Sequence, residues 1–341
     1  MQNLVLILER IAPEALHTVK LRYHILRIVC HHEPVGRRQV ANKIGCSERK
    51  ARTEIEDLRE KGFLTVAASG IYLTDYGREL LEEGDQVIPY LENLSILVER
   101  LKHEFSLEEA VVVPGDSYRD PYAKKDLGRF AARYLKESLF DGCRVAVTGG
   151  STLAEVAEAI SGKVAARGVI ILPSRGGVGG ELDEQANVVA ARIAKEIGAD
   201  YRMLYVPDNL EGELLETICQ EPTINEMVQL IKSCHILVHG IGCAQEMATR
   251  RGMSSASHRM LKERGAVGEA IRYYFNAKGE IVHCHPGIGL EFSDLEHLDK
   301  VIAVAGGSNK AEAIAAVLRN RKRGVLITDE AAARKILSLE G

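Results

Sequence analysis

Val145-Ala-Val-Thr148-Gly149-Gly150-Ser151-Thr152-Leu-Ala-Glu-Val-Ala157 is an apolar run that turns through two glycines and two hydroxyl residues into an amphipathic helical pattern. It predicts a strand, a tight turn and the start of a helix. The first N–H groups of a helix lack intrahelical partners, and the helix dipole leaves partial positive charge there, so this turn is suited to bind a phosphate. The alternative is an ordinary turn in which Ser151 or Thr152 caps the helix.

A second stretch repeats the pattern and adds a lysine: Val301-Ile-Ala-Val-Ala305-Gly306-Gly307-Ser308-Asn309-Lys310. Neither stretch matches the G-x-G-x-x-G dinucleotide motif or the P-loop. Two strand-Gly-Gly-Ser turns that both open helices predict one site, lined by several loops at the carboxyl ends of a parallel sheet.

Short apolar runs alternate with helical patterns through the rest of the chain beyond Phe105. This alternation predicts a Rossmann-like, doubly wound α/β domain with a parallel sheet covered on both faces. The predicted strands are 110–113, 144–147, 169–172, 203–206, 236–239, 301–304 and 324–327.

Composition sets the class of protein. The chain has 341 residues, 46% of them hydrophobic, and 44 basic against 48 acidic residues, which suits two folded domains. Its first apolar run, Leu4–Leu8, is much shorter than the roughly 20 residues that span a bilayer and lacks the flanks of a signal peptide, so we expect a cytoplasmic protein without a membrane segment. Seven cysteines without a C-x-x-C pair indicate reduced thiols. Adjacent strand residues point to opposite faces, so His283-Cys284-His285 predicts no metal site.

The first part of the chain contains the pattern of a DNA-binding unit. One helix is predicted over residues 15–31, and two more, Arg37–Ile44 and Glu48 to about Lys61, flank the turn Gly45-Cys46-Ser47. Val40 and Ile44 face one way on the first of this pair, and the second presents an apolar face of Ala51, Ile55 and Leu58, so the two helices are expected to pack.

This packing leaves a basic outer face, followed by a strand, a turn and a strand within residues 63–74. A helix-turn-helix with a basic outer face and a wing is typical of a reader of duplex DNA. The alternative is a small interaction module with a solvated charged face, since Glu48, Glu54, Glu56 and Asp57 share the second helix. The residues expected to contact DNA are Arg37, Arg38, Arg49, Lys50, Arg52 and Thr53.

A linker follows the wing. Apolar residues from Leu80 to Phe105 keep one helical stripe, which Pro89 interrupts, so a clean helix is expected from about Tyr90. This helix either pairs with a symmetry mate or packs on the next domain; helix-turn-helix readers usually bind as dimers, which favours pairing. The predicted domains are 1–90, for DNA binding with the linker, and 91–341, for effector binding and oligomerisation.

Other loops after predicted strands carry polar groups. Arg175 precedes a glycine run, 176–180, and suits a phosphate, although a mobile surface loop is the alternative. His239 follows an apolar strand and is expected to be a hydrogen-bonded core residue. Glu269 suits a sugar hydroxyl or an exposed position. The loops are rich in phosphate donors and poor in catalytic pairs, which favours binding over turnover.

Four motifs together carry a family resemblance: Thr148-Gly-Gly-Ser-Thr152, Pro173-Ser-Arg-Gly-Gly177, Leu237-Val-His-Gly-Ile-Gly242 and Ala303-Val-Ala-Gly-Gly-Ser-Asn-Lys310-Ala-Glu-Ala-Ile314. With the winged unit before them, the chain resembles the sorbitol-operon regulator (SorC) family of sugar-responsive bacterial transcription factors over nearly its whole length.

The resemblance implies an effector domain related to sugar-phosphate isomerases and deaminases but used as a sensor, with no cofactor. For the members that control glycolysis it implies fructose 1,6-bisphosphate as effector, repression of a triose-phosphate operon until that sugar accumulates, and dimers that pair into tetramers on operator DNA. An isomerase-like enzyme with an accessory DNA-binding domain is the alternative. Ser151 stands where threonine is expected and keeps the hydroxyl. The implied effector residues are Gly149, Gly150, Ser151, Thr152, Arg175, Gln185, Arg250, Arg251, Glu269 and Lys310.

Overall fold

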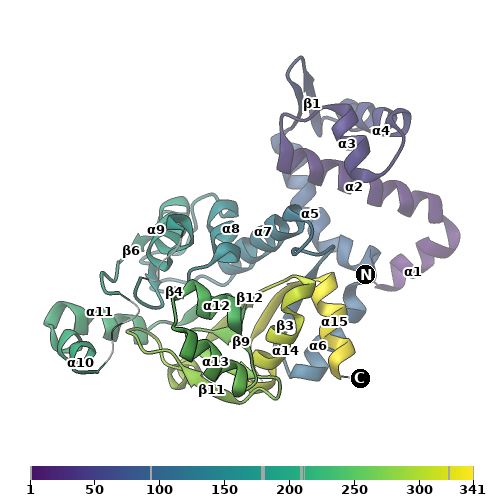
Figure 1. Ribbon diagram of the computed structural model, residues 1–341. Coiled ribbons are helices and arrows are strands. Elements are labelled where there is room, and N and C mark those ends of the chain that lie inside the picture. Colours follow the sequence, from purple (N-terminus) through teal and green to yellow (C-terminus); the bar gives the residue numbers. More distant parts are fainter. Residues whose placement is uncertain are drawn as a thin grey trace. The chain divides into compact units, whose positions relative to one another are not determined.

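The computed structural model describes residues 2–92, 94–177, 181–207, 210, 212–321 and 323–340. The chain divides into two compact units, Met1–Ser95 and Ile96–Gly341 (Figure 1). The sequence placed this boundary at residue 90. Among the described helices, none is both long enough and apolar enough to cross a membrane.

The first unit is a winged helix-turn-helix. Ser47 caps the second helix of the motif, because its side chain accepts the Lys50 N–H, and Gly45 ends the first helix in the left-handed conformation (φ 72°). The paired strands β1 and β2 form the wing. The elements in order are α1 (Gln2–Ile11), α2 (Pro13–His32), α3 (Arg37–Ile44), α4 (Glu48–Glu60), β1 (Leu64–Ala67), β2 (Gly70–Leu73) and α5 (Asp75–Leu91).

The predicted inward faces of α3 and α4 form the core of this unit. Val40, Ala51 and Ile55 are fully buried and pack in one cluster with Ile25 of α2 and Ile71 of the wing. Burial of a large aliphatic side chain contributes about 1.5–3 kcal/mol. The apolar spacing therefore places the basic residues between them on the outside.

The linker differs from the prediction. The apolar stripe from Leu80 to Phe105 lies on two helices: α5 begins at Asp75, where Thr74 caps it, and continues past Pro89 to Leu91, and the later helix is α6 (Leu94–Phe105), which begins four residues after the predicted start at Tyr90. Leu97, Leu101 and Phe105 of α6 are buried within the single chain. Their burial supports the alternative that this stripe packs on the chain itself instead of pairing with a symmetry mate.

The second unit contains a seven-stranded sheet, in which every pair of neighbouring strands is parallel. Its order is β3-β13-β12-β7-β4-β5-β6. From β4 the chain winds outward through β5 and β6, then returns to β7 on the other side of β4 and winds outward through β12 and β13. The switch point of this doubly wound fold therefore lies between β4 and β7. The strands are β3 (Glu109–Val113), β4 (Arg144–Val147), β5 (Ile170–Pro173), β6 (Asp200–Tyr201), β7 (Ile236–His239), β12 (Lys300–Val304) and β13 (Val325–Asp329).

Helices cover the sheet. Alternate strand residues such as Val145 and Val147 pack in one apolar cluster with α7, α8 and α9, and the residue between them, Ala146, is equally buried on the opposite face. The remaining helices are α7 (Pro121–Glu137), α8 (Ser151–Ala159), α9 (Ala186–Ile197), α10 (Gly212–Gln220), α11 (Pro222–Lys232), α12 (Ala244–Arg250), α13 (Ser255–Glu263), α14 (Ala311–Asn320) and α15 (Glu330–Glu340).

Two features of this unit differ from the prediction made from the sequence. The strand predicted at 203–206 was wrong: the Leu204 backbone exchanges hydrogen bonds of 3.0 Å with the Asn187 side chain, while the edge strand is β6. A second, antiparallel sheet also forms, in the order β11-β10-β9-β8. Its strands are β8 (Gly242–Cys243), β9 (Ala266–Ala270), β10 (Tyr273–Asn276) and β11 (Ile281–Cys284).

Candidate effector site

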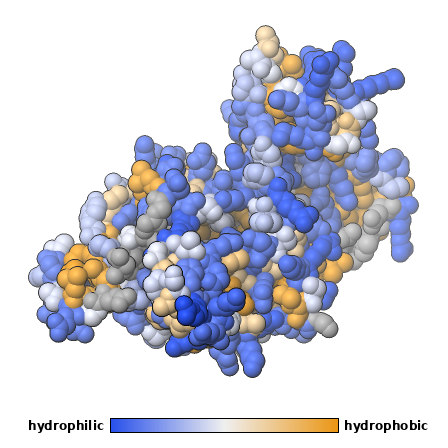
Figure 2. Space-filling view, viewed as in Figure 1, coloured by the Kyte–Doolittle hydropathy of each residue, from blue (hydrophilic) through white to orange (hydrophobic). Residues whose placement is uncertain are grey.

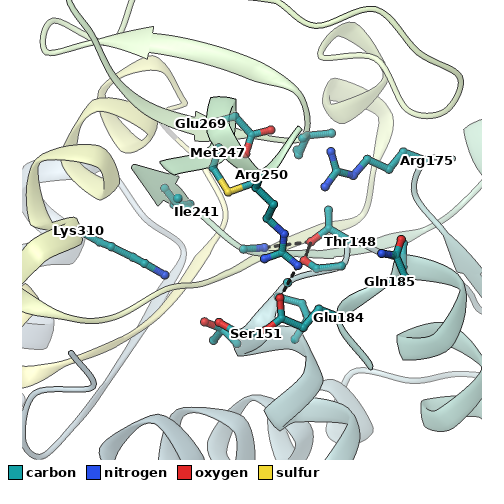
Figure 3. A pocket seen from close by; sticks show the side chains of 18 of the residues that line it. Thr148, Ser151, Arg175, Glu184, Gln185, Ile241, Met247, Arg250, Glu269 and Lys310 are labelled. Carbon is teal, nitrogen blue, oxygen red and sulfur yellow. Dashed lines mark hydrogen bonds and ion pairs between the residues drawn. The ribbon is translucent and has the colours of Figure 1, made fainter. Parts of the chain in front are cut away.

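A cleft opens at the carboxyl ends of β4, β5 and β7, directly at the switch point. Its empty space is about 710 Å³, open solvent included. The Thr148 hydroxyl accepts the Gly240 N–H at 3.1 Å and so joins the ends of β4 and β7 at the cleft (Figure 3). Of the ten implied effector residues, nine line the cleft: Gly149, Gly150, Ser151, Thr152, Arg175, Gln185, Arg250, Glu269 and Lys310.

The first Gly-Gly-Ser turn lies in this cleft as predicted. Gly150 has φ 118°, which favours glycine, and it forms the N-cap of α8 without any side-chain cap. The alternative in which Ser151 or Thr152 caps this helix is therefore not what the structure shows. The first turn of α8 keeps its dipole and backbone donors directed at the cleft, which is the arrangement that binds phosphate.

The second Gly-Gly-Ser turn is different, because two aspartates already cap it. Asp329 Oδ2 accepts the Gly307 N–H at 2.6 Å, and Asp116 accepts both the backbone N–H (3.0 Å) and the hydroxyl (2.7 Å) of Ser308. Of this stretch, only Lys310 lines the cleft. The expectation that both turns provide phosphate cradles was wrong, because side chains of the protein hold the second one.

Two cations enter the cleft from opposite sides (Figure 3). Burial lowers the pKa of Lys310, and the nearby charge of Lys124 lowers it too, whereas Cys243 and Glu246 oppose this shift. Arg175 is 9% exposed, and its loop is clamped between neighbours: Gly176 donates its N–H to Ile288 O at 3.2 Å. The predicted glycine run is described only as far as Gly177, and Val178–Gly180 lie outside the described residues.

The sequence missed Glu184, which lines the cleft and forms an ion pair with Arg250 (Figure 3). Its backbone oxygen also accepts the Gly150 N–H at 2.8 Å. No motif marks this residue, and only its position directly before Gln185 hints at the cleft. Arg250 therefore already has an anionic partner within the chain.

Glu269 is held at the back of the cleft. Arg251, which lies outside the cleft lining, donates to its Oε1 at 2.7 Å, and the Arg272 N–H donates at 2.6 Å. Burial alone would raise the pKa of Glu269, but the charges of Arg251 and Arg175 and these hydrogen bonds bring it below the ordinary value. Glu269 is thus a buried carboxylate, and not the exposed one that the sequence left open.

A strained turn follows Glu269 and helps to place it. Ile271 (φ 55°) and Arg272 (φ 81°) adopt the left-handed conformation between β9 and β10, which is unfavourable for a β-branched residue. The turn directs Ile271 into the cleft lining and the Arg272 N–H onto Glu269. The antiparallel sheet therefore serves as one wall of the site.

His239 is a core histidine, as predicted. It is 3% exposed, and its Nδ1 lies 3.0 Å from Gly240 O. Burial lowers the pKa of His239 to about 4. In the part of the chain that the structure describes, no three His, Cys, Asp or Glu side chains lie close enough together to hold a metal ion.

The first unit presents the predicted basic face. Arg49, Lys50, Arg52 and Thr53 are exposed on α4, whose opposite face is buried (the face of this unit seen in Figure 2 is largely hydrophilic, with some hydrophobic patches). Thr53 donates its hydroxyl to Arg49 O, and Lys50 Nζ lies 3.0 Å from the His17 ring.

Two of the predicted DNA contacts belong to α3 and are partly neutralised. Arg37 pairs with Glu56 at 3.2 Å, and Arg38 pairs with Glu48 at 3.3 Å. Of the acidic residues that supported the interaction-module alternative, Glu48 and Glu56 thus pair with α3 arginines, whereas Glu54 and Asp57 pair with Arg22 of α2. Arg49, Lys50 and Arg52 of α4 remain exposed.

Each of the two units matches a known protein family. Residues 18–88 match the family described as "CggR N-terminal DNA binding domain", and residues 90–338 match the one described as "Putative sugar-binding domain". The central glycolytic genes regulators of Priestia megaterium and Bacillus subtilis are 41% and 37% identical to this chain, each over 99% of both sequences.

Solved structures show the same relationship. A SorC family transcriptional regulator from Enterococcus faecalis is 39% identical, with a TM-score of 0.67, over 71% of this chain and 99% of that one. The full-length sorbitol operon regulator from Klebsiella pneumoniae, at 22% identity, shares the fold with a TM-score of 0.69 over 89% of this chain and 94% of that one.

Proposed function

This chain belongs to the SorC family of transcriptional regulators, and on that basis we propose that it represses glycolytic genes and releases their operator when it binds fructose 1,6-bisphosphate. The first unit is the DNA reader, and the cleft of the second unit is the sensor. Such a regulator acts in the cytoplasm, where its operator is. The names of the two relatives that match it from end to end support glycolytic genes as the target.

One observation carries the choice of a phosphorylated effector. The first turn of α8 opens onto the cleft uncapped, whereas aspartates of the chain occupy the equivalent turn at Gly307. A helix N-terminus with free donors binds an anion, and a phosphate makes several charge-assisted hydrogen bonds there. The uncapped turn thus lacks the anion that its counterpart already has.

A bisphosphate is favoured because the cations are separate. Lys310 and Arg175 approach from opposite sides of the cleft, with the turn of α8 between them (Figure 3). We assign one phosphate to the α8 turn and the other to Arg175, with Glu269 and Gln185 left for sugar hydroxyls. A monophosphate satisfies only one of these positions.

Sensing without turnover is the second part of the proposal. An enzyme acting on a sugar phosphate needs a base near the reacting carbon with a pKa close to the working pH. The candidates were Glu269 and His239, and both are fixed structurally: the first by Arg251 and the second by burial, which keeps its pKa near 4. A sensor needs only different affinities for the ligand in its two DNA-binding states.

The test measures operator binding and ligand chemistry together. Fluorescence anisotropy on DNA upstream of the glycolytic operon should show tight binding that micromolar to millimolar fructose 1,6-bisphosphate weakens. Arg175→Ala should bind the same DNA without this response. After long incubation the sugar should be recovered unchanged. Steady formation of an aldose or ketose product, lost in Glu269→Gln, would establish the isomerase alternative instead.

The oligomer is part of the same proposal. We infer dimers that pair into tetramers on the operator, since a two-fold operator requires at least two readers. Sedimentation of the protein with and without operator and sugar measures this directly, and a monomer on DNA would contradict it.

A further inference from the structure

We propose that Glu184 sets the affinity of the cleft for phosphates by occupying, with its own carboxylate, the place beside Arg250 that a ligand phosphate takes. The inference rests on the proposed function only in using this cleft as the phosphate site. A ligand then binds by exchange, because its phosphate must displace the carboxylate.

The side chains show the occupied position directly. Glu184 Oε2 and Arg250 Nη2 form an ion pair within the cleft, with the two side chains 22% and 27% exposed. In Figure 3 the Arg250 side chain extends from the end of α12 to Glu184, and a dashed line marks their ion pair. The internal carboxylate therefore lies at Arg250, one of the groups expected to hold a phosphate, while the backbone oxygen of the same residue binds the turn that opens α8.

The backbone explains why the carboxylate stays there. Glu184 O accepts the Gly150 N–H at 2.8 Å, and a Cβ on Gly149 would lie only 2.2 Å from that oxygen. The segment is closed locally as well, since Gln185 donates its N–H to Leu182 O at 3.1 Å. Glycine at 149 thus lets the Glu184 backbone pack against the turn, and the Glu184 side chain pairs with Arg250 from that position.

The charge of a ligand determines whether it can displace the Glu184 carboxylate from Arg250. A carboxylate carries one negative charge, whereas a phosphate monoester carries about 1.5 to 2 at neutral pH and has three acceptor oxygens. A neutral sugar leaves the ion pair intact and gains nothing from Arg250. A phosphorylated sugar gains a stronger interaction with Arg250, but the ion pair between Glu184 and Arg250 must break first. The sugar therefore binds this cleft less tightly than it would bind a cleft without the Glu184 carboxylate.

The test compares wild type with Glu184→Gln, which keeps the shape and removes the charge. In this variant no carboxylate competes with a ligand phosphate for Arg250. Because the ion pair is partly exposed and therefore weak, inorganic phosphate and fructose 1,6-bisphosphate should bind about three- to tenfold more tightly in calorimetry. Asp183→Asn is the matched control, because it removes the same charge from the same turn. Asp183 pairs with Arg192 at 2.6 Å and does not line the cleft. Unphosphorylated fructose should bind no better to either variant.

A double-mutant cycle gives the second readout. In the Arg250→Ala background, Glu184→Gln should lose most of its gain, because the gain acts through the freed guanidinium. Equal or weaker phosphate binding by Glu184→Gln, with an unchanged melting temperature, would overturn the proposal and indicate that Glu184 holds the ligand. Failure of both proteins to bind the bisphosphate would refute that effector, while the inorganic phosphate titration would still decide the role of Glu184.

Discussion

Asp329 accepts a hydrogen bond from the Gly307 N–H at 2.6 Å, and the same oxygen accepts both the backbone N–H and the hydroxyl of Ser117. Its other oxygen accepts the Ala332 N–H at 2.8 Å. The aspartate is fully buried. Its carboxylate therefore does for the second Gly-Gly-Ser turn what a ligand phosphate is proposed to do for the first.

Removing that carboxylate should destabilise the fold without creating a second phosphate site. Asp329→Ala leaves several buried donors unpaired, each costing about 1–3 kcal/mol, so we expect a total loss of about 3–5 kcal/mol in denaturant unfolding. Asp299→Ala, at an exposed position in the same unit, should change little. Undiminished stability, or a new phosphate site in the variant, would show that Asp329 does not hold this turn.

Ligand binding should take up a proton at Lys310. Burial lowers the pKa of its ammonium group, and a phosphate beside it raises that pKa again. Affinity should therefore fall as the pH rises through the lowered pKa. Calorimetry at alkaline pH in two buffers of different ionisation enthalpy measures the uptake, which Lys310→Gln should abolish and the surface change Lys262→Gln should retain. An equal uptake in the Lys310 variant would assign the proton elsewhere.

The adjacent arginines 250 and 251 should behave differently. Arg251 and Glu269 are 1% and 5% exposed, so Arg251→Ala removes the ion-pair partner of a buried carboxylate and should cost about 3–5 kcal/mol of folding stability. The pair of Arg250 is more exposed, so Arg250→Ala should cost about 1 kcal/mol or less while it weakens sugar-phosphate binding. Thermal unfolding and calorimetry on both variants test this; the reverse order of stability losses would contradict the assignment.

Operator recognition should depend on the exposed face of α4. Arg52→Ala or Lys50→Ala should weaken binding by about 1–3 kcal/mol where the side chain reaches a base, and relax preference at that position. Arg59→Ala is the control, because this exposed arginine lies near the end of α4 and pairs with Glu56. Titrations at fixed salt separate base contacts from phosphate contacts, which weaken all sequences alike. Unchanged operator affinity in both variants would mean that another element reads the DNA.

The sequence by itself determined the parts that local spacing controls. Val40, Ala51 and Ile55 recur at helical intervals, so burying them fixed both the helix pair and its basic outer face. The alternating apolar runs predicted six of the seven strands of the large sheet, and turn residues 149–152 and Arg175 were located because they directly follow strands. Glycine and hydroxyl residues at a strand-to-helix junction indicate the start of a helix, and this can be recognised from the local sequence alone.

Only the tertiary structure decided which of these groups are available. The two Gly-Gly-Ser turns have similar sequences, yet Asp116, which is 192 residues away from Ser308 in the chain, caps the second turn. In the same way Asn187 takes the hydrogen bonds of Leu204 that a strand would have made, and Arg251 turns inward to Glu269 while its neighbour Arg250 faces Glu184. The physical reason is that a backbone donor or a guanidinium binds the strongest acceptor that the fold brings near, and sequence distance carries no information about that acceptor.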